Sequence, residues 1–269
     1  MTATAVTSAA PRMRAFAAPR GLERWLSPLA LILIWEFGAR SGVIPARILA
    51  APSSVLVTAW QMTASGELPF NVLVSLGRAL TGLAIGVTLG SALAVTAGLS
   101  KLGEDVVDPP VQMLRTLPTL ALTPLFIVWF GIGETAKVAL IALATTFPVY
   151  LNLYNGIRGV DPKLLEAARS FGLRGWDLVW HVALPGAAPS FLLGLRYALG
   201  VSWLMLVVAE QINASAGLGY LINNARDFSR TDVIVVCLVV YALLGLTTDA
   251  LVRSLERRLL AWRPTFIKS

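Results

Sequence analysis

The sequence predicts an all-α polytopic membrane protein with six transmembrane helices and one polar helix outside the membrane, between the fourth and fifth spans. Three observations predict this fold class. Of the 269 residues, 56% are hydrophobic and only 14% are charged, whereas soluble domains contain roughly a quarter charged residues. The mean hydropathy is +0.72. Finally, apolar runs of a length suited to a bilayer recur along the chain.

The composition also excludes several classes of protein. The single cysteine, Cys237, lies in an apolar run, so no intrachain disulfide can form. The single histidine, His181, provides no cluster of metal ligands. The net charge is +7, but the basic residues lie at the ends of spans rather than on one face, which argues against nucleic-acid binding. We therefore predict no catalytic site and no metal site.

The chain begins with a segment that is unlike the rest. Residues 1–25 are rich in Ala and Pro and contain four arginines, which predicts a disordered basic tail rather than a signal peptide. The first span is expected at 26–39, where Glu36 and Arg40 are four residues apart and can pair on one helix face. A polar loop follows, and a short helix is expected at 53–64.

The second span, 71–99, has a face of small residues. They recur every four positions, at Gly82, Gly86, Gly90, Ala94 and Gly98. In lipid, small residues at this spacing let two helix backbones approach closely, so the pattern predicts a tight seam between two helices. The segment 101–108, with three acids and a lysine, is expected to be a loop, and Pro109 and Pro110 follow it.

The third span, 111–130, contains Pro118 and Pro124. Proline removes a backbone donor and bends a helix, so we expect this span to be broken or bent beside a cavity lined by protein. The fourth span is expected at 136–153.

The fifth and sixth spans are expected at 189–209 and 233–251. Between them, a short helix is expected at 219–227. A second basic tail, residues 256–269, closes the chain.

The distribution of basic residues predicts the orientation. Of the 22 Lys and Arg residues, Arg78 and Arg196 lie inside predicted spans. Another five would be outside if both termini are cytoplasmic, and the remaining fifteen would be inside. This is a clear positive-inside bias, so the segment between spans four and five is predicted to be cytoplasmic.

That segment contains a short amphipathic helix. Asp161 followed by Pro162 is a helix start, with a capping carboxylate and a proline at the first position. Gly172 is a natural stop. The helix between them is about 15 Å long at 1.5 Å per residue, too short to cross a bilayer. Its small residues, Ala167 and Ala168, would let another protein approach closely.

The spacing within this segment matches a known pattern. Glu166-Ala167-Ala168, then Gly172, Val182 and Leu184-Pro185, fits E-A-A-x3-G-x9-I-x-L-P with Val in place of Ile. The segment therefore resembles the EAA loop of the permease subunits of binding-protein-dependent ABC importers. The resemblance extends from about residue 48 to 264. Segments similar to the sulfonate/taurine/nitrate branch are QMLRTLP (112–118), WFGIGETAK (129–137), LPGAAPS (184–190), GLGYL (217–221) and TDV (231–233). ASGEL (64–68) and NARDF (224–228), together with QMLR, most resemble aliphatic sulfonate permeases.

The resemblance implies a type I permease fold over residues 26–255, with a coupling loop at 157–188. In such importers the EAA helix sits in a groove of a cytoplasmic ATPase. The implied ATPase-coupling residues here are Glu166, Ala167, Ala168, Gly172, Leu184 and Pro185. The expected partners are an ABC ATPase dimer, a periplasmic or lipid-anchored substrate-binding protein, the lipid bilayer and a second copy of the permease. No cofactor is expected in this chain, because ATP and Mg²⁺ would bind the ATPase. The implied location is the bacterial cytoplasmic membrane, with both termini cytoplasmic.

Charged residues within the spans are candidates for a translocation path or gate. Arg78, near the outer end of span two, and Arg196, in the inner half of span five, could donate paired hydrogen bonds to a sulfonate-like anion. The alternative is that each reaches the membrane interface or pairs with an acid. Glu210 and Gln211, at the outer end of span five, could form an outer gate or cap the helix.

Two other functions are weighed against an importer subunit. An intramembrane enzyme would need clustered polar residues within spans, and the only histidine lies in the coupling loop. An ion-coupled transporter would usually show intramembrane acids or internal repeats. The nucleotide-binding pattern Gly-x4-Gly-Lys-Ser/Thr is absent from the sequence, so ATP would be hydrolysed by another chain. The expected cargo is aliphatic sulfonates, with taurine, nitrate or another small solute as alternatives.

Overall fold

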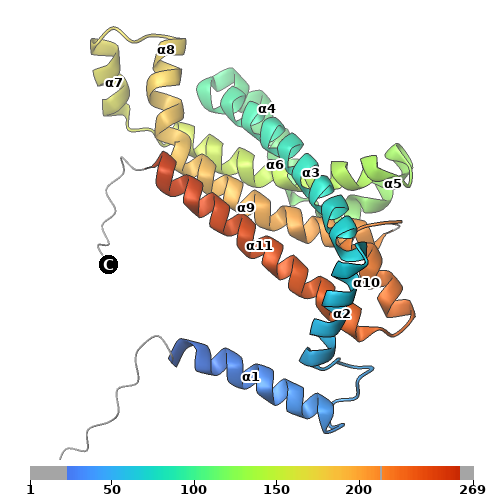
Figure 1. The fold of residues 1–269 in the computed structure, drawn as a ribbon. Helices are drawn as coiled ribbons and strands as arrows, with labels where there is room; N and C mark the ends of the chain where they lie inside the picture. Colours follow the sequence, from blue (N-terminus) through green and yellow to red (C-terminus); the bar gives the residue numbers. More distant parts are fainter. Residues whose placement is uncertain (1–22, 213, 261–269) are drawn as a thin grey trace, which may run out of the picture.

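The computed structural model describes residues 23–212 and 214–260, and within them every regular element is helical (Figure 1). The all-α prediction is therefore confirmed for this part of the chain. The helices of the first half are α1 (Glu23–Arg40), α2 (Pro52–Ala64), α3 (Glu67–Leu99), α4 (Lys101–Thr116), η1 (Thr119–Leu122) and α5 (Thr123–Phe130). Those of the second half are α6 (Glu134–Arg158), α7 (Pro162–Ser170), α8 (Trp176–Leu178), η2 (Val179–Ala183), α9 (Leu184–Gln211), α10 (Leu218–Asp227) and α11 (Thr231–Leu259).

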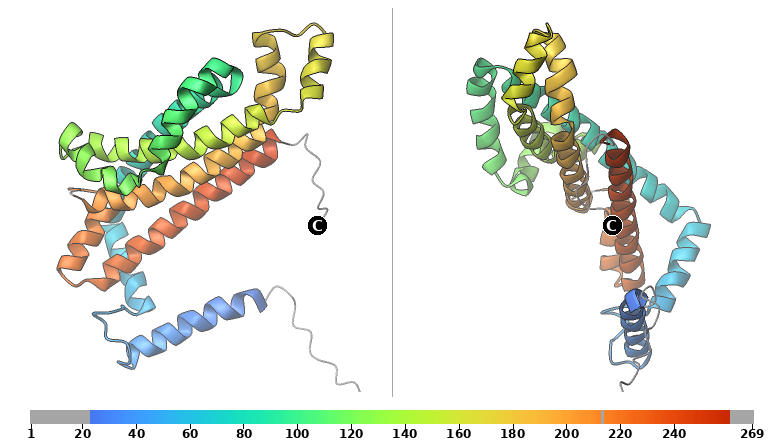
Figure 2. Two further views of the ribbon diagram at one scale, coloured as in Figure 1. Left: turned by 180° about the vertical axis from the view of Figure 1, so that it is seen from behind. Right: turned by 90° about the vertical axis from the view of Figure 1, so that its left-hand side faces the viewer.

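Helix α6 is the centre of the bundle. It packs along its length against both α3 and α9, and α11 lies beside α9 and reaches α2 and α10 (Figures 1 and 2). The long helices all run between the same two ends of the bundle. One end contains the start of α6 and the end of α9, and the other contains α7 and α8, which project beyond the bundle.

The small-residue face of α3 is the seam with α6, as the sequence predicts. A Cβ added at Gly82 would come within 2.6 Å of the Ile141 side chain, and one at Gly90 within 2.6 Å of the Thr146 carbonyl oxygen. Gly86 is tighter still, because its Cβ would overlap the Thr145 hydroxyl. The two backbones are close enough that only glycine fits at these crossings.

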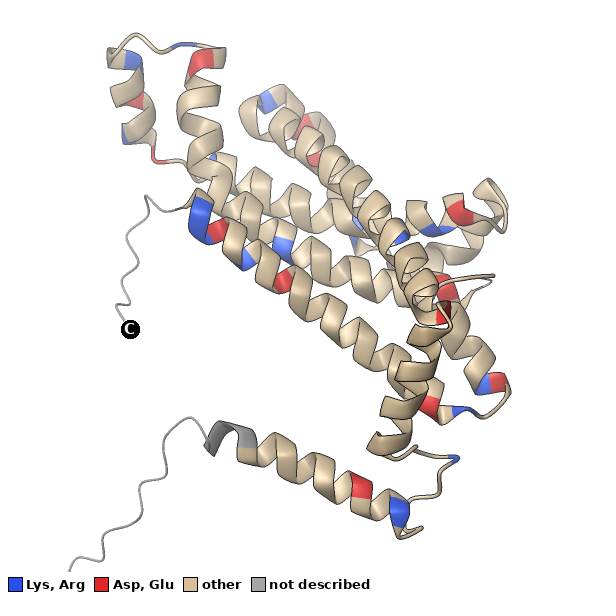
Figure 3. Ribbon diagram, in the orientation of Figure 1, with Lys and Arg blue, Asp and Glu red and all other residues tan. Residues whose placement is uncertain are grey.

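Four helices in the described residues are long and apolar enough to cross a membrane: α3, the continuous helix Trp176–Gln211, α6 and α11. The bent pair formed by α4 with the helical segment Thr119–Phe130 can provide a fifth. Figure 3 shows that the middle of α11 contains no Lys, Arg, Asp or Glu and that the charged residues of this helix lie toward its two ends. Helix α1 lies where the first span was expected, and its crossing of the bilayer remains a prediction. Most of the predicted tails, 1–25 and 256–269, lies outside the described residues, although α11 extends to Leu259.

The prediction of a loop at 101–108 is wrong, because this segment is the first half of α4. Ser100 caps the helix by accepting a hydrogen bond from the Gly103 amide. Glu104 and Asp108, one turn apart, accept hydrogen bonds from the hydroxyls of Tyr154 and Tyr150 on α6, each at 2.7 Å. These contacts hold the helix against α6 on the N-terminal side of the two prolines.

The predicted break in span three is present and has one cause rather than two. The two arms of the span meet at 88°, at Leu117 and Pro118. Leu117 is extended, with φ −72° and ψ 130°, as a residue before proline prefers. Pro124, in contrast, lies in the first turn of α5, where its missing amide costs no hydrogen bond.

Candidate coupling segment and buried polar network

The candidate coupling segment, residues 157–188, contains α7, and both ends of this helix are where the sequence predicts them. The Asp161 carboxylate accepts a hydrogen bond from the Lys163 amide at 2.9 Å and so caps α7. At the other end, Gly172 has φ +90°, and the Leu173 amide bonds back to the Ala168 carbonyl at 3.1 Å. This is the glycine termination that satisfies the last carbonyls of a helix.

The two alanines of the motif face different ways. Glu166 and Ala167 are exposed, whereas Ala168 is buried against the chain itself. Leu184 and Pro185 form the first turn of α9, with Leu184 partly buried against the core of the bundle. The motif therefore links an exposed helical face to the base of a long membrane helix.

The coupling segment also presents apolar side chains. Phe171 is 87% exposed, and Leu164, Trp176 and Trp180 are also exposed. A hollow of about 720 Å³ lies at the base of the segment, lined by residues that include Leu165, Arg169 and Ile157. A group of exposed aromatic side chains such as this one is typical of a surface that contacts either another protein or a membrane.

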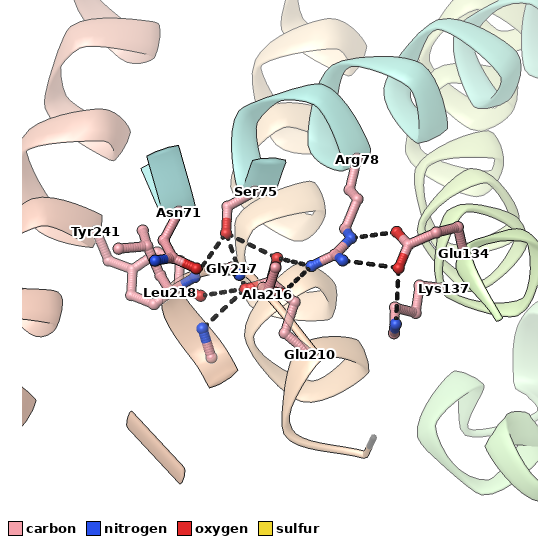
Figure 4. A network of polar contacts seen from close by, with 11 residues as sticks. Asn71, Ser75, Arg78, Glu134, Lys137, Glu210, Ala216, Gly217, Leu218 and Tyr241 are labelled. Atoms are coloured by element: carbon pink, nitrogen blue, oxygen red, sulfur yellow. Dashed lines mark hydrogen bonds and ion pairs between the residues drawn. The ribbon is translucent and has the colours of Figure 1, made fainter. Parts of the chain in front are cut away.

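At the opposite end of the bundle, a buried network surrounds Arg78 (Figure 4). Its Nη1 donates to Glu210 at 2.7 Å and to the Ala216 carbonyl at 2.6 Å. Its Nη2 donates to Glu134 at 2.7 Å, and its Nε bonds the other oxygen of the same carboxylate. Lys137 also donates to Glu134, at 3.0 Å. Two cations and two carboxylates are thus paired with no net charge.

Glu210 is the deepest member of this network. Its side chain is 0% exposed, so its charge must be met by donors from within the protein. Besides Arg78, the donors are the Ser75 hydroxyl at 2.7 Å, the Gly219 amide at 2.8 Å and the Tyr241 hydroxyl at 3.1 Å. Residues of α3, α9, α10 and α11 therefore meet at one carboxylate.

Glycine is required where the chain turns over this carboxylate. Gly217 has φ +111°, and a Cβ there would lie 2.6 Å from Arg78 Nη1. A Cβ on Gly219 would overlap the Glu210 side chain. The Gly217 amide donates to the Asn71 side chain at 2.7 Å, and the Leu218 amide donates to Ser75 at 2.8 Å.

The other sequence-predicted candidates lie apart from this network. Arg196 bonds Asp249 at 2.8 Å, and Asp249 also pairs with Arg253 at 2.9 Å. The Arg196 and Asp249 side chains are 45% and 32% exposed, so this pair is not buried. Gln211 is exposed, and its carbonyl accepts a hydrogen bond from Asn223 at 2.9 Å. The structure thus brings together Arg78 and Glu210 alone among the four candidates.

Several members of the network were not singled out from the sequence. Glu134 lies just before the predicted fourth span, and Lys137 lies at its start. Lys137 was counted among the basic residues outside the membrane and not as a residue within a span. One usable signal is the spacing of Asn71, Ser75 and Arg78, which repeats at helical intervals on one face of span two. The partners on α6 and α9 are brought to that face only by the fold.

Comparison with known proteins identifies the family. Residues 86–261 match the family described as the binding-protein-dependent transport system inner membrane component. The chain belongs to this family of transporter permeases. The permease is 48% identical over 242 residues to the putative aliphatic sulfonates transport permease protein SsuC of Escherichia coli, covering 90% of this chain and 92% of that one. It is 45% identical over 241 residues to the protein of the same name from Bacillus subtilis, covering 90% and 87%.

More distant similarity supports the same assignment. The taurine transport system permease protein TauC of Escherichia coli is 36% identical over 239 residues, or 86% of each chain. A crystal structure of an amino acid ABC transporter superimposes with a TM-score of 0.60 at 23% identity, covering 76% of the permease and 96% of that chain. The permease therefore has the fold of an ABC importer permease and is an integral membrane subunit of such an importer.

Proposed function

We propose that the permease forms the translocation path of an ABC importer for aliphatic sulfonates. The supporting observation is the gradient of identity among relatives that differ in the cargo they are named for. Two relatives named for aliphatic sulfonates are 48% and 45% identical. The taurine permease is 36% identical, and a riboflavin permease of Chloroflexus aurantiacus is 34% identical. All of them match over most of the chain, so the difference is not one of coverage.

In this proposal a cytoplasmic ATPase dimer binds the coupling segment, and ATP and Mg²⁺ bind that dimer. Glu166 and Ala167 face the ATPase, and Ala168 fixes α7 against its own chain. Gly172 ends the helix, and Leu184 and Pro185 pass its movement to α9. The exposed Phe171 next to Gly172 supports the idea that this segment is covered in the assembled transporter.

The proposal places the permease in the bacterial cytoplasmic membrane with both termini cytoplasmic. A second copy of the chain completes the path as a homodimer. A periplasmic or lipid-anchored binding protein delivers the cargo at the end of the bundle that contains the Arg78 network. The positive-inside distribution of Lys and Arg supports this orientation.

We assign the buried network to the outer end of the path. The contacts of Arg78 and Glu210 join five helices there, α3, α6, α9, α10 and α11, so these contacts must persist or be exchanged whenever the helices move. Gln211 extends the same end of α9 toward α10. Arg196 lies in the first half of α9 and pairs with Asp249 of α11. It is a second candidate along the path.

Growth on alkanesulfonates as the sole sulfur source tests the cargo. Deleting the gene in a strain without a second uptake system should abolish growth on ethanesulfonate and leave growth on sulfate unchanged. Normal growth of the deletion strain on ethanesulfonate would contradict the assignment. Loss of growth on taurine alone would instead favour the taurine alternative.

A further inference from the structure

A large hollow lies next to the Arg78 network. Its volume is about 770 Å³, and its walls come from α3, α4, α5 and α6. The lining is mostly apolar and includes Ile85, Leu89, Leu114, Phe126 and Phe147. Among the described residues that line it, Glu134 is the only ionisable one. The hollow is therefore lined by apolar side chains except at Glu134, its one charged residue among those described.

Glu134 lies over two buried cationic side chains, those of Arg78 and Lys137, and forms an ion pair with each. The Glu134 side chain is 58% exposed, whereas those of Arg78 and Lys137 are 5% and 9% exposed. Glu134 occupies one full edge of the Arg78 guanidinium, formed by Nε and Nη2, and it also accepts from Lys137. The inner edge of Arg78 is fixed separately by Glu210 and the Ala216 carbonyl.

The charge balance shows what could replace this carboxylate. Arg78 and Lys137 contribute two positive charges, and the buried Glu210 contributes one negative charge. If Glu134 turned outward, one positive charge would remain uncompensated. A single monovalent anion would restore neutrality, and the guanidinium edge could donate two parallel hydrogen bonds to two of its oxygens.

We propose that Glu134 is a built-in stand-in for the anionic group of the cargo, and that the hollow beside it holds the cargo's apolar tail. This inference rests on the proposed function, because it takes the path to be that of an organic anion. When the cargo enters, its anionic head displaces the Glu134 carboxylate from Arg78 and Lys137. Its alkyl chain lies against the apolar wall formed by α3 and α6. The ligand class is therefore an alkyl monoanion with a head that can bridge a guanidinium edge, as a sulfonate can.

Direct binding to the purified permease–ATPase complex in nanodiscs, without a binding protein, tests this site. The probes are ethanesulfonate, butanesulfonate and hexanesulfonate, measured by isothermal titration calorimetry. Each added methylene should tighten binding by about fourfold as it leaves water. Hexylammonium, which has the same tail and the opposite charge, should not bind at the site. Equal affinity for the three sulfonates would overturn the assignment of the hollow.

Variants at the displaced carboxylate test the stand-in role. Glu134→Gln removes the competing charge and should tighten hexanesulfonate binding by about tenfold. Lys137→Gln should weaken it by a similar factor. Asp227→Asn, which neutralises an exposed carboxylate next to Arg226 elsewhere on the chain, should leave the affinity for hexanesulfonate unchanged. Glu134→Gln binding no tighter than the unaltered complex would refute the proposal.

If the Glu134→Gln permease does not assemble with the ATPase, a second variant tests the same site. Glu134→Asp keeps the charge but shortens the side chain by one methylene, so its ion pair with Arg78 is weaker. Hexanesulfonate binding should therefore tighten, but by less than in Glu134→Gln. No tightening in this variant would also refute the site. Failure of the proposed cargo looks different: Glu134→Gln would then bind hexanesulfonate tightly while the intact transporter imported no sulfonate.

Discussion

Replacing Glu210 with glutamine should destabilise the permease more than any single change at an exposed ion pair. The substitution keeps the shape of the side chain but removes its charge. One carboxylate oxygen becomes an NH₂ group, which cannot accept the hydrogen bonds that Glu210 receives from its neighbours. Arg78 keeps Glu134 but loses its buried partner, and its side chain is only 5% exposed.

The expected magnitude follows from burial. Removing one partner of a buried ion pair costs about 3–5 kcal/mol, because the other charge remains desolvated. At roughly 2–4 °C per kcal/mol for a chain of this size, the melting temperature should fall by on the order of 10 °C. The assay is thermal unfolding of the purified permease in nanodiscs, followed by tryptophan fluorescence.

The matched control is Asp249→Asn. It neutralises a carboxylate whose pair with Arg196 is partly exposed, and such pairs contribute about 0–1 kcal/mol. The melting temperature should therefore fall by only a few degrees. If Glu210→Gln melts no lower than Asp249→Asn, the buried network does not stabilise the permease as we infer.

Three further changes test the seam, the turn and the coupling surface. Gly86→Ala should lower the free energy of unfolding by about 1–3 kcal/mol, because it overpacks the α3–α6 seam. Gly77→Ala is the control, since a Cβ there meets open space on the same helix, and it should be neutral or slightly stabilising in the same thermal assay. Gly217→Ala should cost at least about 2 kcal/mol, because it adds strain at positive φ to a clash with Arg78; a melting temperature equal to that of Gly77→Ala would contradict this. Ala167→Leu should weaken co-purification of the ATPase by about tenfold without changing thermal stability, and Ala84→Leu, at an exposed position of α3, should leave co-purification unchanged.

The parts of the fold that depend on local sequence were predictable. The cap at Asp161 and the stop at Gly172 are set by residues within one turn of each helix end. The seam between α3 and α6 was also predictable, because small residues at every fourth position are typical of helices that pack closely in lipid. The break at Pro118 follows from the steric restriction that proline places on Leu117.

The errors arose where distant contacts outweigh local preference. The charged residues of 101–108 predict a loop, yet this segment is helical, and its Glu104 and Asp108 bond tyrosines of α6. The Arg78 network could not be assembled from the sequence for a similar reason. Its two carboxylates, Glu134 and Glu210, are 76 residues apart in the chain, and only the packing of α6 between α3 and α9 brings them to one guanidinium.

The most direct test of the account is uptake by the complete transporter. The permease, its ATPase and its binding protein, reconstituted in proteoliposomes, should accumulate radiolabelled ethanesulfonate only when ATP is supplied on the side of the coupling segment. Vanadate should stop the uptake. Accumulation that persists without the ATPase, or that follows an imposed ion gradient instead, would contradict the assignment of this chain as an ABC importer permease.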